Sequence, residues 1–418
     1  MSRYIPRLLD PVLIERLQSS GALVIDGPKA SGKTETGRRL AKSEVLLDSD
    51  VEQRQLALAD PRLVLRGGVP RLLDEWQSAP DLWNAVRREV DDRRTVGQFI
   101  LTASASPADD ITRHSGAGRF SRLRMRPLTM VETGHSDAAV SLSSLLDGEP
   151  PNAAGSDLTL DDLAARMITG GWPGSQGLSM ASSFRYAVDY LDQVARLEIA
   201  GLDGARHDPR KVFALLRSIA RTTASETANA TLARDAGGSD GPLHPDTVAR
   251  YLDALQRAFL LELQEAWDIP LRTRAPLRKA PKRHLVDSSL TTAALRIGDP
   301  RRLLDDPATL GLLFESLVFQ QLRVFADLAE GGVFHFRSKY GPEVDMIVEK
   351  ADGSWGAFEV KLGAGLLDQA AKTLRSFALS IDTSRRAGPS VLGVVVPSGP
   401  SYVRADGVAV LALTSLGP

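Results

Sequence analysis

The chain has 418 residues, enough for about two or three domains, and its 43% hydrophobic and 25% charged residues are ordinary for a globular protein. A formal net charge of -1 provides no overall basic field, so any nucleic-acid surface must be local. The absence of cysteine excludes disulfides, thiolate metal sites and a cysteine nucleophile, and it suits a reducing compartment.

The sequence carries no sign of a membrane segment or a targeting signal. Residues 1–7 lack the apolar stretch that a signal peptide needs. No run of about 18 apolar residues occurs, so we expect no membrane span. Together these features predict a cytoplasmic protein.

The first part of the chain predicts a parallel sheet with helices on both faces. After an expected helix within residues 1–20, short apolar runs alternate with helical segments. Such runs are typical of buried parallel strands. The runs lie at 23–25, 45–47, 71–73, 99–102 and 123–127.

The residues after the first run fit the phosphate-binding pattern G-x-x-x-x-G-K-[ST] at every fixed position. They are Gly27, Pro28, Lys29, Ala30, Ser31, Gly32, Lys33 and Thr34. A strand, a glycine loop and a helix N-terminus place several backbone N–H groups around one anion. Lys33 can reach the β- and γ-phosphates of ATP, and the Thr34 hydroxyl can ligate Mg²⁺. The alternative, a glycine-rich turn that matches by chance, does not account for this context.

A later strand ends in two acidic residues. Leu72 and Leu73 lead into Asp74 and Glu75, which is the Walker B arrangement. We predict that Asp74 holds the Mg²⁺ shell and that Glu75 polarises the attacking water as a general base. The alternative is a helix N-cap, a common role for such a pair after apolar residues.

Further polar residues stand at the next two predicted strands. Thr102 and Ser104 end one strand, where such ATPases place a residue that senses the γ-phosphate. A hydroxyl-bearing turn is the alternative. Arg119 precedes the following strand and can act as a catalytic arginine finger on a neighbouring subunit of a homo-oligomer. A solvated arginine is the alternative there.

These segments resemble prokaryotic AAA+-type ATPases that carry a C-terminal restriction-endonuclease-like domain. The resemblance rests on the P-loop, Leu-Leu-Asp-Glu-Trp-Gln, Ala-Pro-Asp-Leu-Trp, Phe-Ile-Leu-Thr-Ala-Ser and Gly-Arg-Phe with Arg-Pro-Leu-Thr. It continues through Gly-Gly-Trp-Pro at 170–173 and Arg-Lys-Ala-Pro-Lys at 278–282, so it covers most of the chain. Arg71 interrupts a usually apolar strand and Ala103 replaces a common glycine, but neither change removes a catalytic group.

The chain divides into segments of different character. Residues 1–135 predict a P-loop ATPase domain, and 136–157 a linker with one short apolar helix. Residues 158–283 predict a helical, winged-helix-like region, and 284–418 a PD-(D/E)XK nuclease-like domain. The expected fold class is therefore α/β, with an AAA+-like parallel sheet, a helical middle and a restriction-endonuclease-like α/β end.

The middle region contains a helix–turn–helix pattern at 231–236 and 245–259. If its second helix reads DNA, Arg250 and Arg257 are the arginines it offers, and a basic strip at 271–283 can contact phosphates. The apolar residues of that helix and its aspartates oppose this interpretation. The alternative is a structural module between the two ends of the chain.

The C-terminal part resembles the PD-(D/E)XK pattern in Glu343, Asp345, Glu359 and Lys361. Asp345 and Glu359 can hold Mg²⁺ or Mn²⁺, while Glu359 and Lys361 are the expected catalytic pair. A three-residue loop ending at Gly353 pairs 350 with 354, and therefore 345 with 359 and 343 with 361. Since side chains alternate faces along a strand, all of them then share one face.

Glu315, on an otherwise apolar helix, is a further metal candidate because an unpaired buried carboxylate is costly. Gln369 is an accessory candidate on the following helix. Carboxylates this close repel each other, so at least one should have a raised pKa unless a cation compensates. The alternative is a surface hairpin with a Glu–Lys cross-strand pair.

The sequence therefore predicts a Mg²⁺-dependent ATPase that acts on nucleic acid, with DNA as the expected partner. Whether its C-terminal domain also cleaves nucleic acid is left open. The alternative is an ATP-driven switch or scaffold whose nuclease-like domain binds a partner without cutting.

Overall fold

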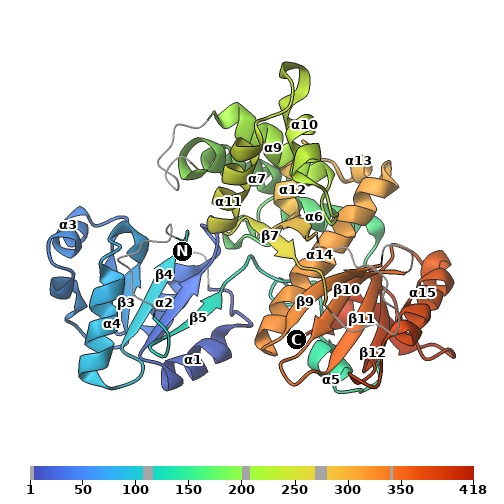
Figure 1. The fold of residues 1–418 in the computed structure, drawn as a ribbon, viewed down its shortest axis with the longest axis horizontal. Helices are drawn as coiled ribbons and strands as arrows, with labels where there is room; N and C mark the ends of the chain where they lie inside the picture. Colours follow the sequence, from blue (N-terminus) through green and yellow to red (C-terminus); the bar gives the residue numbers. More distant parts are fainter. Residues whose placement is uncertain (1–3, 107–115, 200–207, 269–279, 339–341) are drawn as a thin grey trace.

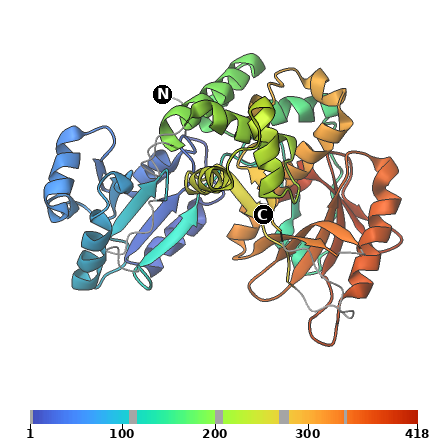
Figure 2. The same cartoon turned by 45° about the horizontal axis from the view of Figure 1, so that its top comes forward.

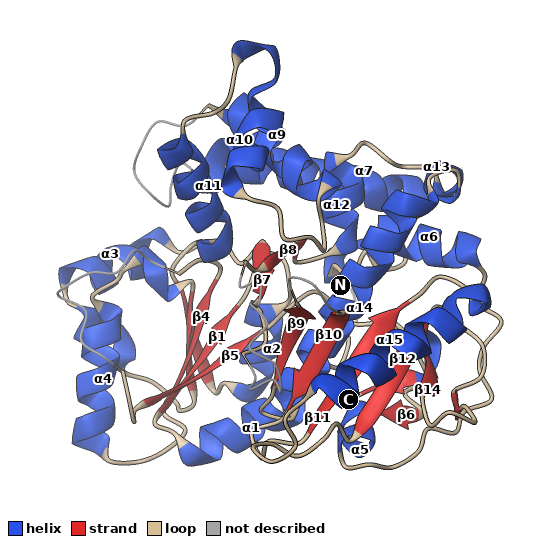
Figure 3. Cartoon of the chain, turned by 45° about the vertical axis from the view of Figure 1, so that its right-hand side comes forward, coloured by secondary structure: helices blue, strands red, loops and turns tan. Residues whose placement is uncertain are grey.

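The computed structural model describes residues 4–106, 116–199, 208–268, 280–338 and 342–418. A parallel sheet near the N-terminus, a helical region and a mixed sheet near the C-terminus follow each other along the chain (Figure 1). The helical region lies over both sheets, as Figure 3 shows, and it bridges them in the tilted view of Figure 2. Within the described ranges, no helix combines the length and apolar character needed to cross a membrane.

The N-terminal sheet has the strand order β2-β3-β4-β1-β5, and every neighbouring pair is parallel. Its strands are β1 (Ala22–Asp26), β2 (Ser43–Leu46), β3 (Arg71–Asp74), β4 (Phe99–Ala103) and β5 (Phe120–Arg124). The helices around it are α1 (Asp10–Ser19), α2 (Lys33–Leu40), α3 (Val51–Ala59) and α4 (Leu82–Arg93). The parallel sheet predicted from the alternating runs is thus confirmed.

One predicted strand is displaced. The sequence places a strand at 123–127, whereas β5 ends at Arg124. The chain leaves the sheet there because Arg126 turns toward two acids of other elements. Its guanidinium lies 2.7 Å from Glu262 and 2.6 Å from Asp327.

The middle region consists mainly of helices. They are α6 (Leu160–Thr169), α7 (Met180–Gln193), α9 (Pro209–Arg221), α10 (Asn229–Gly237) and α11 (Pro245–Arg257), with a π-helical turn, Val194–Glu198, after α7. The antiparallel hairpin of β7 (Leu261–Gln264) and β8 (Lys282–Leu285) follows α11. The helix α12 (Ser288–Ala294) shares a buried core with α7 and α9. The boundary expected at 283 to 284 therefore falls inside β8.

The C-terminal sheet has the order β13-β14-β12-β11-β10-β9 and mixes parallel and antiparallel pairs. Its strands are β9 (Gly332–Arg337), β10 (Glu343–Glu349), β11 (Trp355–Val360), β12 (Val391–Val396), β13 (Tyr402–Val403) and β14 (Ala409–Ala412). The preceding helices are α13 (Pro300–Leu304) and α14 (Pro307–Leu328), and α15 (Leu367–Ser380) follows β11. Separate apolar cores form on the two faces, one with α14 and the other with α15.

Part of the expected linker at 136–157 is built into the C-terminal part. There, β6 (Val140–Ser141) pairs in parallel with β15 (Leu416–Gly417). The helix α5 (Leu142–Leu146) contributes its leucines to the core that contains α14, and Figure 1 places it beside the C-terminal sheet. The chain thus visits the C-terminal part before it enters the helical region.

Candidate functional site

The P-loop connects the carboxyl end of β1 to the start of α2. Gly32, at the helix N-cap, has a φ of 98°, in the left-handed region that glycine adopts most readily. At Gly27 a Cβ atom would collide with the carbonyl oxygen of Met125. Both glycines are therefore needed by the backbone path itself, which exposes the loop amides to a bound anion.

Two polar side chains of the P-loop, those of Lys33 and Ser31, have hydrogen-bonding groups available for a bound anion. The Lys33 ammonium, buried under the loop, donates to the Pro28 carbonyl at 2.8 Å. Burial lowers the pKa of Lys33, whereas the nearby Glu75 and Asp74 raise it. The buried Ser31 hydroxyl has no hydrogen-bond partner among the described residues. These groups fit a phosphate.

A carboxylate and two hydroxyls meet beside the loop. Asp74 Oδ1 accepts from the Thr34 hydroxyl at 2.8 Å and from the Thr102 hydroxyl at 2.5 Å. Burial raises the pKa of Asp74, while these two hydrogen bonds lower it. Oxygen ligands of this kind suit Mg²⁺, so Thr34 and Asp74 fit a metal held between the protein and a nucleotide.

Glu75 has a strained backbone and a restrained side chain. Its φ and ψ of 54° and 48° lie in the left-handed region, which costs a residue with a side chain about 1–3 kcal/mol and is common at functional sites. Its Oε2 atom accepts from the Ser104 hydroxyl at 2.5 Å and also from the Gln77 amide. Ser104 therefore contacts the expected base, whereas Thr102 contacts Asp74.

A cleft of about 980 Å³ extends from the P-loop to α7. The P-loop wall contains the Lys33, Thr34, Glu75 and Ser104 positions discussed above. The opposite wall is formed by Tyr186, Asp189, Tyr190 and Gln193 of α7, with Ala258 and Leu260 at its edge. The Tyr190 hydroxyl donates to the Lys29 carbonyl at 3.3 Å and thereby joins the two walls. Sequence reasoning missed these residues and Gln77, because the helical periodicity of α7 identifies only its buried face.

Arg119 lies at the amino-terminal ends of the parallel strands, whereas the P-loop lies at their carboxyl ends. Its carbonyl accepts from the backbone N–H of Ala22, the first residue of β1, whereas the P-loop follows the last residue of that strand. Its guanidinium pairs with Asp91 of α4 at 2.9 Å and is 42% exposed. Arg119 therefore does not reach the nucleotide cleft of its own chain, and its role in trans stays a prediction.

The β10–β11 hairpin has the predicted register. Met346 lies opposite Phe358 and Glu349 opposite Trp355, which continues to Asp345 opposite Glu359. Gly353 has the expected left-handed φ, 86°. The Lys361 ammonium lies 2.6 Å from Glu359 and 3.3 Å from Asp345, so these side chains converge on one face.

A lysine from the middle region completes this cluster. The Lys282 ammonium of β8 lies 2.7 Å from Glu315 and 3.7 Å from Glu343, and the residue is only 2% exposed. The sequence suggests instead that Lys282 belongs to a phosphate-binding strip. Residues 271–279 of that strip lie outside the described residues. We call the set of Lys282, Glu315, Glu343, Asp345, Glu359 and Lys361 the acidic cluster.

The acidic cluster perturbs its own carboxyl groups. Burial, followed by the charge of Asp345, raises the pKa of Glu359 to about 8 and that of Glu315 to about 7, against the effect of the lysines. Among the described residues, no set of three or more His, Asp and Glu side chains is arranged to hold a metal ion. Because the lysines occupy the carboxylate oxygens, this donor set does not fit a divalent cation as it stands. Gln369 is exposed on α15.

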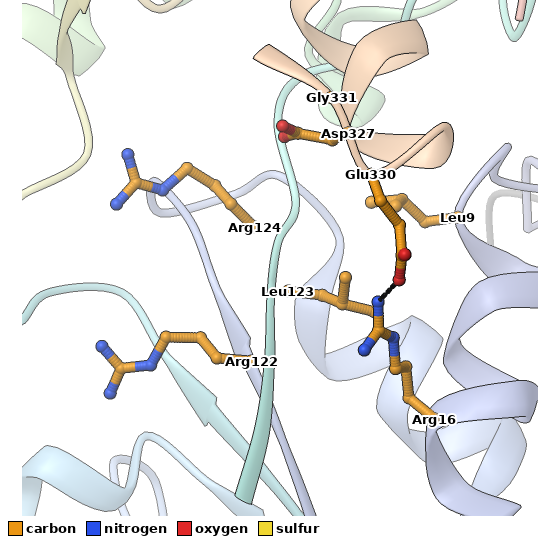
Figure 4. A pocket seen from close by; sticks show the side chains of 8 residues that line it. All are labelled: Leu9, Arg16, Arg122, Leu123, Arg124, Asp327, Glu330 and Gly331. Carbon is orange, nitrogen blue, oxygen red and sulfur yellow. Dashed lines mark hydrogen bonds and ion pairs between the residues drawn. The ribbon is translucent and has the colours of Figure 1, made fainter. Parts of the chain in front are cut away.

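A second cleft, of about 260 Å³, lies between β5, α1 and the end of α14 (Figure 4). Arginines give it a basic appearance, but each one has an acidic partner. Arg16 pairs with Glu330 at 2.5 Å, as Figure 4 shows. Arg122 pairs with Asp26 at 3.2 Å, and Arg124 lies 3.9 Å from Glu262. The cleft is therefore a charge-compensated junction.

Comparison with known proteins identifies the class of the first part. Residues 19–134 match the family model of an AAA domain, so this part of the chain is similar to AAA-type, ATPase-like domains, and a domain of that type implies nucleotide and Mg²⁺ use. Residues 160–301 and 310–416 match two domains of unknown function, DUF8612 and DUF4143. These two matches assign no nuclease activity.

Two uncharacterized mycobacterial proteins are similar to most of the chain. They come from Mycobacterium tuberculosis (strain ATCC 25618 / H37Rv) and Mycobacterium bovis (strain ATCC BAA-935 / AF2122/97). Each is 27% identical over 375 residues, which is 89% of this chain and 76% of the relative.

Proposed function

We propose that the protein is a Mg²⁺-dependent ATPase that works as a nucleotide-driven switch. The observation that carries this proposal is the cleft shared by the P-loop and α7. A nucleotide in that cleft touches two parts of the molecule at once, so its binding and hydrolysis can alter how they pack. A ligand shifts a conformational equilibrium only through different contacts in the two states, and a shared cleft provides them.

The proposed roles follow from the contacts of each side chain. Lys33 binds the β- and γ-phosphates, and Thr34 with Asp74 holds Mg²⁺. Glu75 accepts the proton of the attacking water once a nucleotide has displaced its present hydrogen bonds. Thr102 orients Asp74, and Ser104 controls the position of Glu75.

A contact behind the cleft supports transmission to the middle region. Ser106, just beyond β4, donates its N–H to the Arg257 carbonyl at 2.8 Å, and the Arg257 guanidinium donates to the Ser106 carbonyl at 3.1 Å. The order of α9, α10, α11 and the β7–β8 hairpin, with a bridge from Ser225 to Arg283, supports a winged-helix-like module. Because α11 uses Arg257 for this contact, we favour a structural role over DNA reading.

Two substitutions separate ATP binding from hydrolysis. Lys33→Ala removes the charge facing the phosphates, so ATP affinity should fall roughly tenfold or more. Glu75→Gln removes only the base, so binding should persist while turnover falls by about 10²-fold or more. Calorimetry with ATP and Mg²⁺ measures the first effect, and phosphate release measures the second.

Exposed residues of the same domain provide matched controls. Lys42→Ala and Glu52→Gln make the same chemical changes at exposed positions, so both binding and turnover should be unchanged. Wild-type ATP affinity in folded Lys33→Ala would remove the nucleotide assignment. Wild-type turnover in Glu75→Gln would remove only the base.

A second candidate function is ATP-dependent action on nucleic acid. The convergence of Glu315, Asp345, Glu359 and Lys361 supports it, because PD-(D/E)XK nucleases use this combination. The mixed strand order with α14 and α15 on opposite faces also supports a restriction-endonuclease-like fold.

One assay decides between the two candidates. ATP turnover is measured with DNA, with RNA and without either, in Mg²⁺ and in Mn²⁺, while cleavage is followed in the same tubes. DNA-stimulated turnover together with cleavage that Asp345→Asn abolishes would favour the nuclease. ATP turnover that nucleic acid does not stimulate, without cleavage, would favour the nucleotide-driven switch.

A further inference from the structure

The acidic cluster already contains two cations, Lys282 and Lys361, which partly compensate its four carboxyl groups. Lys361 lies between Asp345 and Glu359 on one side. On the other side, Lys282 lies between Glu315 and Glu343, at 2.7 and 3.7 Å. The ammonium groups thus take the positions from which a metal ion would have to contact the same oxygens.

A divalent metal ion and a lysine ammonium group cannot favourably occupy this site together. Mg²⁺ requires oxygen ligands at about 2.0–2.1 Å, and an ammonium hydrogen-bonded to those oxygens blocks that approach. A divalent ion a few ångströms from an ammonium is also strongly repelled, more so where water is excluded. Lys282 is almost fully buried, so little water is present to screen the repulsion.

The backbone that carries Lys282 is fixed in this position. Lys282 pairs with Gln264 across the β7–β8 hairpin. The Gln264 amide donates to the carbonyls of Phe334 and Asp345, at 2.9 and 2.8 Å, which ties the hairpin to β9 and β10. His335 of β9 lies 3.0 Å from the Ala280 carbonyl, just before β8. The backbone of Lys282 is thus held in place, and burial of the side chain opposes movement of its ammonium out of the cluster.

We infer that Lys282 is a built-in counter-ion that replaces a divalent cation, so that the acidic cluster binds no metal while β8 is seated against it. Metal-dependent cleavage at this cluster would then require β8 to withdraw first. The inference does not depend on ATP hydrolysis, and its test leaves the P-loop intact.

The test titrates full-length, nucleotide-free protein with Mn²⁺ alone and follows free Mn²⁺ by electron paramagnetic resonance. Wild type and Asp345→Asn should bind Mn²⁺ equally. Lys282→Met should gain one Mn²⁺ per chain, bound roughly tenfold or more tightly than any Mn²⁺ on wild type, because the buried repelling charge is gone and the Lys361 side chain, 25% exposed, can turn toward water. The double variant Lys282→Met/Asp345→Asn should lose that gain. The control is Lys350→Met, which removes a lysine paired with Asp147 at 2.6 Å and should behave as wild type.

Stability provides a second measurement. Lys282→Met leaves Glu315 buried without its partner, so its thermal midpoint should fall, and Mn²⁺ should restore part of the loss. If that variant does not fold, Lys282→Met/Glu315→Gln removes the pair together and keeps Asp345 and Glu359 for the titration. Binding of Mn²⁺ by wild type that Asp345→Asn abolishes would overturn the inference. Folded variants without Lys282 that gain no Mn²⁺ would overturn it equally.

Discussion

Asp74 depends on its neighbours more than its position at a strand end suggests. Its carboxylate is buried and accepts hydrogen bonds from hydroxyls of both the P-loop and β4. A buried carboxylate is expensive to leave unsatisfied, so these donors stabilise its ionised form against the effect of burial and orient it for Mg²⁺. The Thr102 hydroxyl also accepts the Glu75 N–H at 3.1 Å, which joins the metal-binding and water-activating residues in one network.

Thr102→Val tests this network with little change in shape. Loss of a buried hydrogen bond to a charged group costs about 1.5–3 kcal/mol, so turnover at limiting Mg²⁺ should fall roughly 10- to 100-fold. Thr102→Ser should retain most activity, because it restores the hydroxyl. Phosphate release across a Mg²⁺ series measures the effect.

The control for this series is Thr373→Val. The Thr373 hydroxyl donates to the Gln369 carbonyl of its own helix at 3.1 Å, far along the chain from the cleft. Unchanged Mg²⁺ dependence in Thr102→Val would mean that Thr34 alone orients Asp74, and Thr102 would then be a strand-ending residue without a role at the site.

The sequence predicts well those residues whose position is set by the local chain path. The glycines and the Lys33-Thr34 pair are specified by local geometry, so a motif identifies them. The sequence also predicts polar residues at the end of β4, but not that Thr102 contacts Asp74 and Ser104 contacts Glu75. Lys282 and Tyr190 reach their positions only through packing between distant segments, which no local pattern encodes.

Helices and strands show the same contrast between features set locally and features set by packing of distant segments. The β10–β11 register is predicted because the length of a turn fixes the pairing of the strands it joins. In contrast, β6 and β15 are very short and exist because they pair with each other from opposite ends of the C-terminal part. The strand β8 reads as the end of a basic strip, yet tertiary packing buries Lys282.

A single arginine links elements from all three parts. Arg126 follows β5 and contacts Glu262 of β7 and Asp327 of α14, and both Arg126 and Glu262 are buried. Arg126→Met leaves the buried Glu262 with only the more distant Arg124, at 3.9 Å, and breaking a buried pair typically costs about 3–5 kcal/mol. The apparent thermal midpoint should therefore fall by about 5 °C or more, measured by circular dichroism.

Arg16→Met provides the comparison for Arg126. Arg16 also connects the N-terminal part to the end of α14, through Glu330, but the pair is largely exposed. Exposed pairs contribute about 0–1 kcal/mol, so this variant should unfold close to the wild-type temperature. Equal effects of the two substitutions would contradict the importance of burial at the Arg126 junction.

At the scale of the whole molecule, the arrangement separates two groups that ATP hydrolysis can need. The P-loop and Glu75 line the cleft shared with α7, while Arg119 lies at the opposite ends of the strands of the same sheet. Within one chain they cannot meet. If Arg119 takes part in hydrolysis, a neighbouring copy must supply it, and activity then depends on assembly.

Mixing two inactive variants tests this arrangement. Arg119→Ala keeps its own nucleotide site but lacks the finger, whereas Lys33→Ala keeps the finger but lacks a working site, so a mixed assembly contains complete sites at some interfaces. Since a finger is worth a factor on the order of 10³–10⁵ in kcat, partial restoration should stand well above either variant alone. Turnover per wild-type subunit should also rise with protein concentration, while Arg94→Ala, at an exposed position after α4, should remain active. If both variants are folded and the mixture stays inactive, or if Arg119→Ala turns over ATP at the wild-type rate, each chain hydrolyses ATP without an arginine from its neighbour.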